Sequence, residues 1–337
     1  MPSAPAPASR RGRALYALRR TWRGYLRGRG YDAAAALTFF AVLSAFPATL
    51  LAVAAFAVRG SEKGADSELV ALLGPFIPSG QEAAVSDAVG ELLSIRSPGI
   101  ALMVGLALTL WTVSGWCTAY GRAVNTICGV QEGRPFWLFR GWMLVIAAAT
   151  VVLAGAAIGV LLVGPETAGE LTGGPLAPVT SIVWGVLRWP LLLVLLVVLL
   201  ALLQRHAPNV RVSGLRRLSL GSLLTLAAWT LVTGAFALYL HLIDSYGQLY
   251  GRLGILLAGL VWAYLSSTAL VLGAQLDVEL IRLVQLGGGL EAEDHVRLPV
   301  KSTYRMLLLA RQRDQDLAAG REIREELSRS SASSSSD

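Results

Sequence analysis

The sequence predicts an all-α fold, a polytopic membrane protein whose six transmembrane helices form a bundle with both termini in the cytoplasm. The composition points to a membrane, because 54% of the residues are hydrophobic and 15% are charged, whereas soluble domains carry roughly 25% charged residues. The charge distribution points to an orientation. Of the 29 Lys and Arg residues, 24 fall on one side when the apolar stretches are threaded alternately across a bilayer.

Six apolar stretches of the chain are long enough to cross a bilayer as helices, which takes about 20 residues. A helix also satisfies its backbone polar groups within the segment, as the hydrocarbon requires. The spans are 33–58, 100–120, 141–163, 179–203, 218–243 and 254–276. The expected transmembrane domain therefore covers 33–281, between an arm over 1–32 and a charged tail over 282–337.

Lys and Arg residues gather in four of the segments outside these spans. The arm holds eight, the connection after the second span three, the connection after the fourth span four and the tail nine. The other three connections hold four together, with nine Asp and Glu residues. Because the cytoplasmic flanks of membrane helices collect Lys and Arg, both termini are expected in the cytoplasm and the chain in the cytoplasmic membrane.

The same cations account for the sequence pI of about 9.8 without a nucleic-acid partner. They border membrane helices and are not interleaved with exposed aromatic residues. The expected partners are therefore membrane lipids, whose anionic headgroups attract basic flanks, and no nucleic acid is expected to bind. A homo-oligomer is compatible with the sequence.

The arm contains a basic amphipathic segment over 13–29. Its apolar residues recur at helical spacing and arginines fill the other face, a pattern typical of a helix that lies at a membrane interface. We expect it to meet anionic headgroups of the inner leaflet; the alternative is a charge cluster that only sets topology. The apolar positions are Leu15, Leu18, Trp22, Tyr25 and Leu26, and the arginines are Arg19, Arg20, Arg23 and Arg27.

Two further segments lie outside the spans. The first outer connection, 59–99, carries two amphipathic stripes separated by Pro75 and Pro78, which predicts two short helices that cap the outer mouth of the bundle. The tail predicts a charged helix over 303–327. Its Ser-rich end, 328–337, cannot bury enough apolar surface to fold.

The sequence contains none of the motifs GxxxxGKS/T, GxGxxG after a strand, HExxH, CxxC or GxSxG, which mark nucleotide, metal and catalytic sites. His206, His241 and His295 fall on an inner loop, an outer helix end and the tail, so they cannot share a metal. Asp277 and Glu279 are the close acidic pair near the bundle, but a spacing of two on a helix points them apart. We expect no enzyme activity, no cofactor and no metal.

Arg188 is the one cation inside an apolar span. A charge at the bilayer centre costs at least about 2.5 kcal/mol, so it is kept mainly where it has a use. Pro190 removes a backbone donor and loosens the preceding turn, and an anionic substrate or a lipid phosphate could bind there. The alternative is that the fourth helix begins near Trp189, so that Arg188 reaches the outer interface.

Other residues within the spans indicate a substrate path or a close contact between helices. Ser44 and Pro47 lie at mid-depth in the first span, where a proline kinks the helix and frees a carbonyl. Alternatively, Ser44 bonds back into its own helix. The spacing of Gly155 and Gly159 is typical of close helix packing in membranes.

Several segments together resemble the YihY family, also called the virulence factor BrkB family and once labelled ribonuclease BN. They are AAAALTFFAVLSAFPATL over 33–50, LWTVSGWCTAYGRAVNTICGV over 110–130, Arg134 with Pro135 and Arg140, Pro208 with Asn209, and YGRLG followed by WAYLSSTALVLGAQLDVEL between 250 and 280. They occur in order over most of 31–281. The resemblance implies a six-helix bacterial inner-membrane protein with cytoplasmic termini, and it implies that the nuclease label is a misassignment.

By this resemblance, the characteristic positions of the family fall on Ser44, Pro47, Trp111, Arg122, Asn125, Tyr250, Gly251, Gly254, Gly273 and Ala274. Where the family usually reads GAELN, this chain reads GAQLD from Gly273 to Asp277. The acid has moved from the third place to the fifth. Asp277 is therefore the residue that would substitute for it, from the next turn of the helix.

The polar residues at depth and the lack of a catalytic motif favour a protein that transports or flips an anionic lipid or small solute. The expected path residues are Arg188, Ser44, Pro47, Arg122, Asn125, Tyr250 and Asp277, and the packing or hinge positions are Gly155, Gly159, Gly251, Gly254 and Gly273. The alternative is a non-transporting scaffold in envelope assembly that docks partners on the arm and the tail. A membrane ribonuclease is the least favoured.

Overall fold

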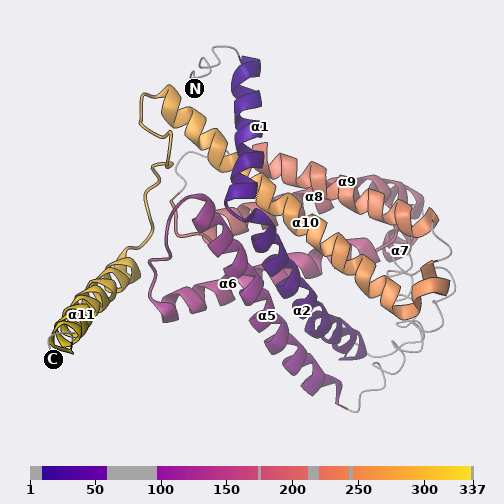
Figure 1. Cartoon of the computed structure of the whole chain (residues 1–337). Helices are drawn as coiled ribbons and strands as arrows, with labels where there is room; N and C mark the ends of the chain where they lie inside the picture. The colour runs from indigo at the N-terminus through magenta and orange to yellow at the C-terminus, as the bar shows by residue number, and fades with distance from the viewer. Residues whose placement is uncertain (1–9, 59–96, 174–175, 212–219, 243–245, 335–337) are drawn as a thin grey trace.

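The computed structural model describes residues 10–58, 97–173, 176–211, 220–242 and 246–334 (Figure 1). The helices are α1 (Arg10–Arg27), α2 (Gly30–Val58), α5 (Pro98–Ile127), α6 (Phe136–Leu162), α7 (Pro165–Thr172), α8 (Ala177–His206), α9 (Leu220–Leu242), α10 (Tyr246–Gly287) and α11 (Tyr304–Ser334). Over these ranges, β structure is limited to one isolated antiparallel bridge between Val210 and Val300. The all-α prediction is confirmed.

Six of these helices, α2, α5, α6, α8, α9 and α10, are long and apolar enough to cross a membrane. Each coincides with one of the predicted spans, so the six-helix bundle is confirmed. The agreement follows from length, since a hydrocarbon core of about 30 Å needs about 20 helical residues. The predicted cap over 59–99 lies almost wholly outside the described residues.

α10 is longer than the sixth predicted span, because nothing in its sequence stops it earlier. It runs from Tyr246 to Gly287 without an internal proline. It ends where Gly289 adopts a left-handed φ of 78° and the Leu290 amide donates to the Gln285 carbonyl at 3.0 Å, a conformation that favours glycine. The additional turns carry charged residues past the end of the predicted span.

Two helices differ from the sequence prediction. α7 occupies the connection between α6 and α8, where the sequence predicts no helix, and it begins with Pro165, a residue preorganised for the first helical position. α11 continues to Ser334, so the prediction of an unfolded end from 328 onward is corrected for 328–334. Extending an existing helix adds one hydrogen bond for each residue fixed, and this favours continuation through the serines.

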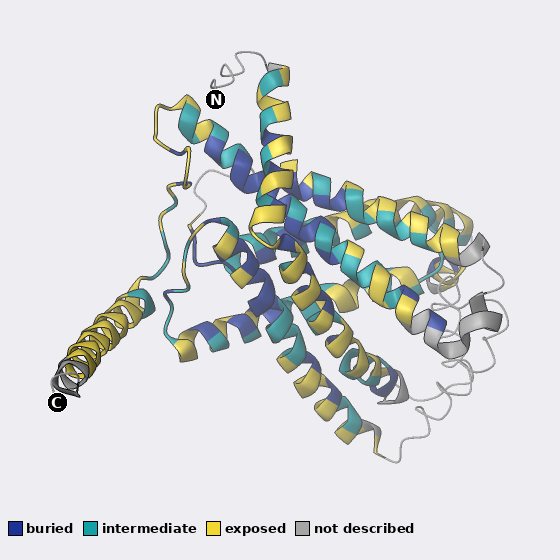
Figure 2. Cartoon of the chain, viewed as in Figure 1, coloured by how far each residue is buried: buried dark blue, intermediate teal, exposed yellow. Residues whose placement is uncertain are grey.

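The buried core lies where α2, α5 and α10 meet, together with parts of α1, α6 and α8 (Figure 2). Its largest fully buried side chains include Tyr120, Leu37 and Met143. Apolar side chains farther out on the spans are exposed, for example Val152 and Ile182. Such faces suit contact with lipid tails, which are as apolar as leucine.

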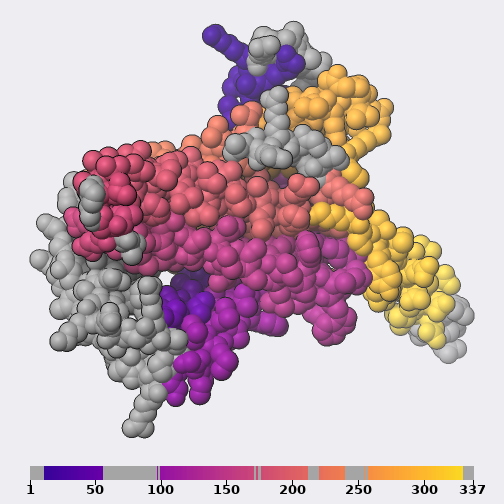
Figure 3. Space-filling model, turned by 180° about the vertical axis from the view of Figure 1, so that it is seen from behind, coloured from indigo at the N-terminus to yellow at the C-terminus, as the bar shows by residue number. Residues whose placement is uncertain are grey.

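One end of the bundle gathers α1, the connections 128–135 and 207–211, and the segment 288–303; we call it the terminal face. The connections meet there, because Arg134 Nη2 donates to the Ala207 carbonyl at 2.7 Å. Alternate threading of the spans requires these segments to share a side. α11 leaves this face and projects away from the bundle, as the views from both sides show (Figures 1 and 3).

Candidate functional site

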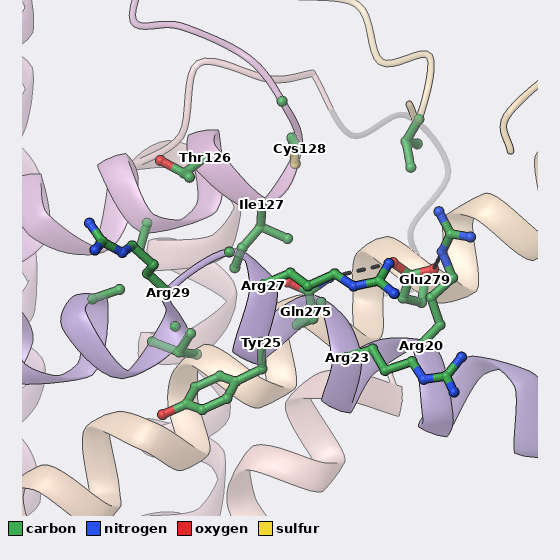
Figure 4. Close-up of a pocket in the computed structure, with 18 of the residues that line it drawn as sticks. Arg20, Arg23, Tyr25, Arg27, Arg29, Thr126, Ile127, Cys128, Gln275 and Glu279 are labelled. Atoms are coloured by element: carbon green, nitrogen blue, oxygen red, sulfur yellow. Dashed lines mark hydrogen bonds and ion pairs between the residues drawn. The ribbon is translucent and has the colours of Figure 1, made fainter. Parts of the chain in front are cut away.

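A pocket of about 1200 Å³ lies on the terminal face between α1, the first turns of α2, the last turns of α5 and α10 (Figure 4). Residues 294–296 complete its wall. Figure 4 shows Arg29 at one end of the pocket, Arg20 with Glu279 at the other, and Ile127 of α5 above the arm. The volume lies somewhat above the usual range for small-molecule sites, about 300–1,000 Å³.

Arginines dominate the polar lining of the pocket. Those of α1 recur at spacings of three, four and eight along the chain, which places them on adjoining faces of one helix. Seven arginines stand against three carboxylates, a formal surplus of four positive charges. The arginines are Arg19, Arg20, Arg23, Arg27, Arg29, Arg122 and Arg282, and the carboxylates are Asp32, Glu279 and Asp294.

Glu279 is buried at one end of the pocket and forms ion pairs with two of these arginines. Its Oε2 lies 3.0 Å from Arg20 Nε and 2.9 Å from Arg282 Nε, and its side chain is 3% exposed. Both guanidinium groups also donate to the Glu293 carbonyl, at 2.7 Å from Arg20 and 3.3 Å from Arg282. The cluster therefore ties α1 and α10 to the segment 288–303.

Four other arginines of the pocket, Arg19, Arg23, Arg27 and Arg122, form no ion pair with a carboxylate of the described ranges. Their side chains are exposed. Guanidinium groups present a planar fork of donors that suits carboxylate and phosphate, and they are weakly hydrated. These four residues therefore supply the charge with which the pocket can bind an anion.

An apolar wall lies beside the arginines. Ala33, Ala36 and Phe40 line the pocket from one face of α2, and Ala119 and Ala123 line it from α5, which packs along α2. These positions belong to the first turns of the α2 span and the last turns of the α5 span. The pocket therefore lies at one end of these two spans, and an amphiphile would meet charge and apolar surface together.

Asn125 lies outside this pocket and organises the neighbouring connections. Its Oδ1 accepts a hydrogen bond from the backbone N–H of Asn209 at 2.7 Å, and its Nδ2 donates to Glu132 Oε2 at 3.1 Å. Asn209 is fully buried and donates to the Ser302 carbonyl at 2.9 Å. This network joins 128–135, 207–211 and the segment 288–303.

Glu132 pairs with Arg134 in the same network, with Oε1 2.7 Å from Nε and Oε2 2.8 Å from Nη2. Burial by itself raises the pKa of Glu132, but the hydrogen bonds and charge of Arg134 and the Asn125 amide outweigh it and hold the pKa below the usual 4.5. A carboxylate whose pKa is lowered in this way binds a proton less readily in the folded protein than in the unfolded chain.

Folding stability should therefore fall as the pH drops below about 4.5, where the unfolded Glu132 side chain takes up a proton first. Thermal unfolding of the detergent-solubilised protein between pH 3 and pH 7 measures this dependence, at pH values chosen to bracket the usual pKa. Glu132→Gln should unfold more easily at pH 7 and lose less stability on acidification. An identical acid dependence in both proteins would contradict the assignment.

Asp277 faces α9 and does not line the pocket described above, which we call the arginine pocket. Its Oδ1 accepts a hydrogen bond from the Gly221 amide at 2.8 Å, next to the start of α9, where a carboxylate is stabilised by the helix dipole. Its Oδ2 accepts from Gln204 Nε2 at 3.4 Å, and Ser222 Oγ donates to Gln204 Oε1 at 2.8 Å. Asp277 and Glu279 therefore have different partners, as their spacing predicts.

Arg188 lies within α8 and does not line the arginine pocket. α8 begins at Ala177, so the alternative that this helix starts near Trp189 is wrong. Arg188 is half-buried, with its guanidinium carbon 5.0 Å from the centre of the Trp189 ring. Its Nε has no hydrogen-bond partner in the described part of the chain.

The remaining predicted residues are dispersed. Ser44 Oγ donates to the Phe40 carbonyl at 2.7 Å, which is the bond back into its own helix. α2 continues through Pro47. Gly254 is buried. The surroundings of the Tyr250 side chain and of Gly251 lie outside the described residues.

The predicted packing glycines behave differently from one another. Gly155 and Gly159 have open space within 4 Å of where a Cβ would be, so the expected close helix contact is absent within the described ranges. Gly273 does make such a contact, because a Cβ there would lie 2.7 Å from the Gly221 carbonyl oxygen. A spacing of four between glycines permits close packing, but the partner helix must be present on that face.

Among the predicted path residues whose side chains the structure describes, only Arg122 lines the pocket. The Glu279 cluster and the Asn209 contacts have no counterpart among the sequence predictions. Glu279 and Arg282 did carry a signal, since a spacing of three on a helix allows an ion pair. The contact with Arg20, which lies in the arm at the other end of the chain, had no such signal.

Comparisons with known proteins cover most of the chain. The family model described as Virulence factor BrkB matches residues 21–294. A ribonuclease-like protein named YfkH, from Bacillus subtilis (strain 168), is 24% identical over 258 residues, which are 75% of this chain and 90% of that protein.

Two proteins named UPF0761 membrane protein also match. The one from Alkalilimnicola ehrlichii is 28% identical over 72% of this chain and 53% of its own length. The one from Laribacter hongkongensis is 28% identical over 77% of this chain and 60% of its own length. The chain thus spans somewhat more than half of these two relatives. No solved structure matches it.

Proposed function

Because the chain belongs to the virulence factor BrkB family and is an integral membrane protein, we propose that it transports an anionic lipid or small anionic solute, or flips it between leaflets. The observation that carries this proposal is the pocket of about 1200 Å³ with a surplus of four positive charges. It lies at the ends of three membrane spans, where an anionic headgroup can enter from the leaflet and a solute from water.

We place the terminal face in the cytoplasm and the chain in the inner membrane, because the segments on that side carry 24 of the 29 Lys and Arg residues. α1 supports this placement. Its exposed apolar side chains Leu15, Leu18, Trp22 and Leu26 form a free stripe that suits the headgroup boundary of the inner leaflet. Anionic headgroups would then gather beside the arginines of the pocket.

A flux measurement tests the proposal. Full-length protein in liposomes should speed the transbilayer movement of fluorescent anionic lipids more than that of zwitterionic lipids. Arg122→Gln, in the pocket, and Arg188→Leu, within α8, should each lower the rate by roughly tenfold, since a hydrogen bond to a charged group contributes about 1.5–3 kcal/mol. Arg13→Gln is the matched control, an exposed position of α1 that does not line the pocket.

The transport proposal fails if the protein leaves the movement of every lipid, and the uptake of inorganic phosphate, at the rate of protein-free vesicles. The scaffold alternative would then be favoured. α11 supports that alternative, because it is exposed from Leu307 to Ser328 and carries apolar residues such as Leu307 and Leu317 at the surface. A helix of this kind can dock a partner protein.

We propose no nuclease activity for this chain; the name ribonuclease-like belongs to its relative YfkH. Nuclease chemistry with two metals needs several carboxylates around one pocket. Asp277 and Glu279 instead bond to different elements, Asp277 to the start of α9 and Glu279 to two arginines. Metal-dependent RNA cleavage by the purified protein that is lost in Asp277→Asn or Glu279→Gln would contradict this proposal.

A further inference from the structure

The two ends of the arginine pocket differ in charge. Glu279 shares one carboxylate oxygen between Arg20 and Arg282, at 3.0 Å and 2.9 Å, and both guanidinium groups also donate to backbone carbonyls. A carboxylate of the protein therefore already occupies this end and balances one of its two positive charges. An incoming anion at this end would have to displace a buried carboxylate, which is costly because a charge left without its partner in the interior is strongly disfavoured.

Four arginines of the pocket, Arg19, Arg23, Arg27 and Arg122, pair with no carboxylate of the described residues. They come from two elements, three from α1 and Arg122 from α5. At the other end, one carboxylate contacts two guanidinium groups. The unpaired arginines therefore exceed what a single monoanion needs, and three of them suffice for a phosphate monoester, which carries a charge of about −1.5 to −2 at pH 7 and three acceptor oxygens.

We propose that this pocket binds a phosphate monoester, with Arg23, Arg27 and Arg122 on its oxygens and the attached apolar group against the wall formed by Ala36 and Phe40. The inference deepens the proposed function and rests on it for the membrane setting. Glu279 acts as the resident counter-ion that directs the phosphate away from Arg20. Lipids with a phosphomonoester headgroup and soluble phosphomonoesters share the recognised chemistry.

Equilibrium binding to purified full-length protein in detergent tests the inference without any transport step. The probes are dioctanoyl phosphatidic acid (a monoester), dioctanoyl phosphatidylglycerol (a diester with one charge), dioctanoyl phosphatidylcholine, and glycerol 3-phosphate. We expect phosphatidic acid to bind tightest, with the diester roughly tenfold weaker, since it offers fewer charged acceptors to the arginines. Glycerol 3-phosphate should bind more weakly than phosphatidic acid because it lacks the apolar group.

Arg23→Gln, Arg27→Gln and Arg122→Gln should each weaken phosphatidic acid binding by roughly tenfold or more, while Arg13→Gln leaves it unchanged. If a variant fails to fold, the salt dependence of the wild-type affinity still decides, because ionic strength screens exposed charges. Equal affinity for the monoester and the diester, or unchanged binding in all three variants, would overturn the proposal. Glycerol 3-phosphate binding as tightly as phosphatidic acid would overturn the role of the apolar wall.

Binding and flux separate the two proposals. A protein that binds phosphatidic acid through these arginines but moves no lipid in vesicles supports the inferred site and contradicts transport. A protein that moves anionic lipids yet shows no preference for the monoester supports transport and contradicts the inferred ligand.

Discussion

Replacing Gly273 by valine is expected to prevent α10 from packing against α9. A Cβ at this position would lie 2.7 Å from the Gly221 carbonyl oxygen and closer still to Thr225 Oγ1. The carbonyl belongs to the backbone, so the helices themselves would have to separate. Overpacking typically costs about 1–3 kcal/mol, and we expect the upper end of that range. The midpoint of thermal unfolding in detergent measures the loss.

Gly155→Val is the matched control for this prediction. It places the same side chain in another span, α6, where nothing lies within 4 Å of the new Cβ. Its unfolding midpoint should stay close to that of the unsubstituted protein. If both variants lose equal stability, the contact between α9 and α10 is not the cause.

Replacing Glu279 by alanine is expected to destabilise the terminal face by about 3–5 kcal/mol, the usual cost of breaking a buried ion pair by removing one partner. Arg282, 6% exposed, and Arg20, 34% exposed, would lose their carboxylate. The free energy of unfolding measures the total effect. Hydrogen exchange should also become faster in α1 and in 292–294, whose contacts depend on these arginines.

The exposed ion pair of Arg297 with Glu291, on the same face of the molecule, is the matched control for the Glu279 prediction. Its atoms lie 3.2 Å apart, but the side chains are 61% and 86% exposed. Exposed pairs contribute about 0–1 kcal/mol, so Glu291→Gln should change stability little. A loss as large as that of Glu279→Ala would show that burial does not set the strength of these pairs.

The six spans and the family could be predicted because each depends on local sequence. In lipid, apolar stretches of at least 19 residues can satisfy their backbone hydrogen bonds only as helices, so the apolar pattern itself predicts a helix. The ends of the helices were harder to predict. α10 extends to Gly287 and α11 to Ser334, because charged and polar residues outside the hydrocarbon still permit a helix to continue.

The candidate site was predicted only in parts. The arginines of the arm were expected on a basic face, and Arg122 entered through the family resemblance, but their convergence on one pocket was not foreseen. Asn125 and Asp277 were expected on the path, whereas they bond to the Asn209 amide and to the start of α9. Arg188 lies within its helix, apart from the pocket-lining residues.

The sequence by itself determined the class of protein, the number of spans and the uneven distribution of cations, because these follow from the local requirement that helices in lipid be apolar and that their cytoplasmic flanks be basic. Only the tertiary structure decided which arginines pair with a carboxylate and which do not. Arg20 is far from Glu279 in sequence and meets it only because α1 crosses α10. Electrostatic pairing acts over a few ångströms in space, so the crossing of helices determines where the free positive charge lies.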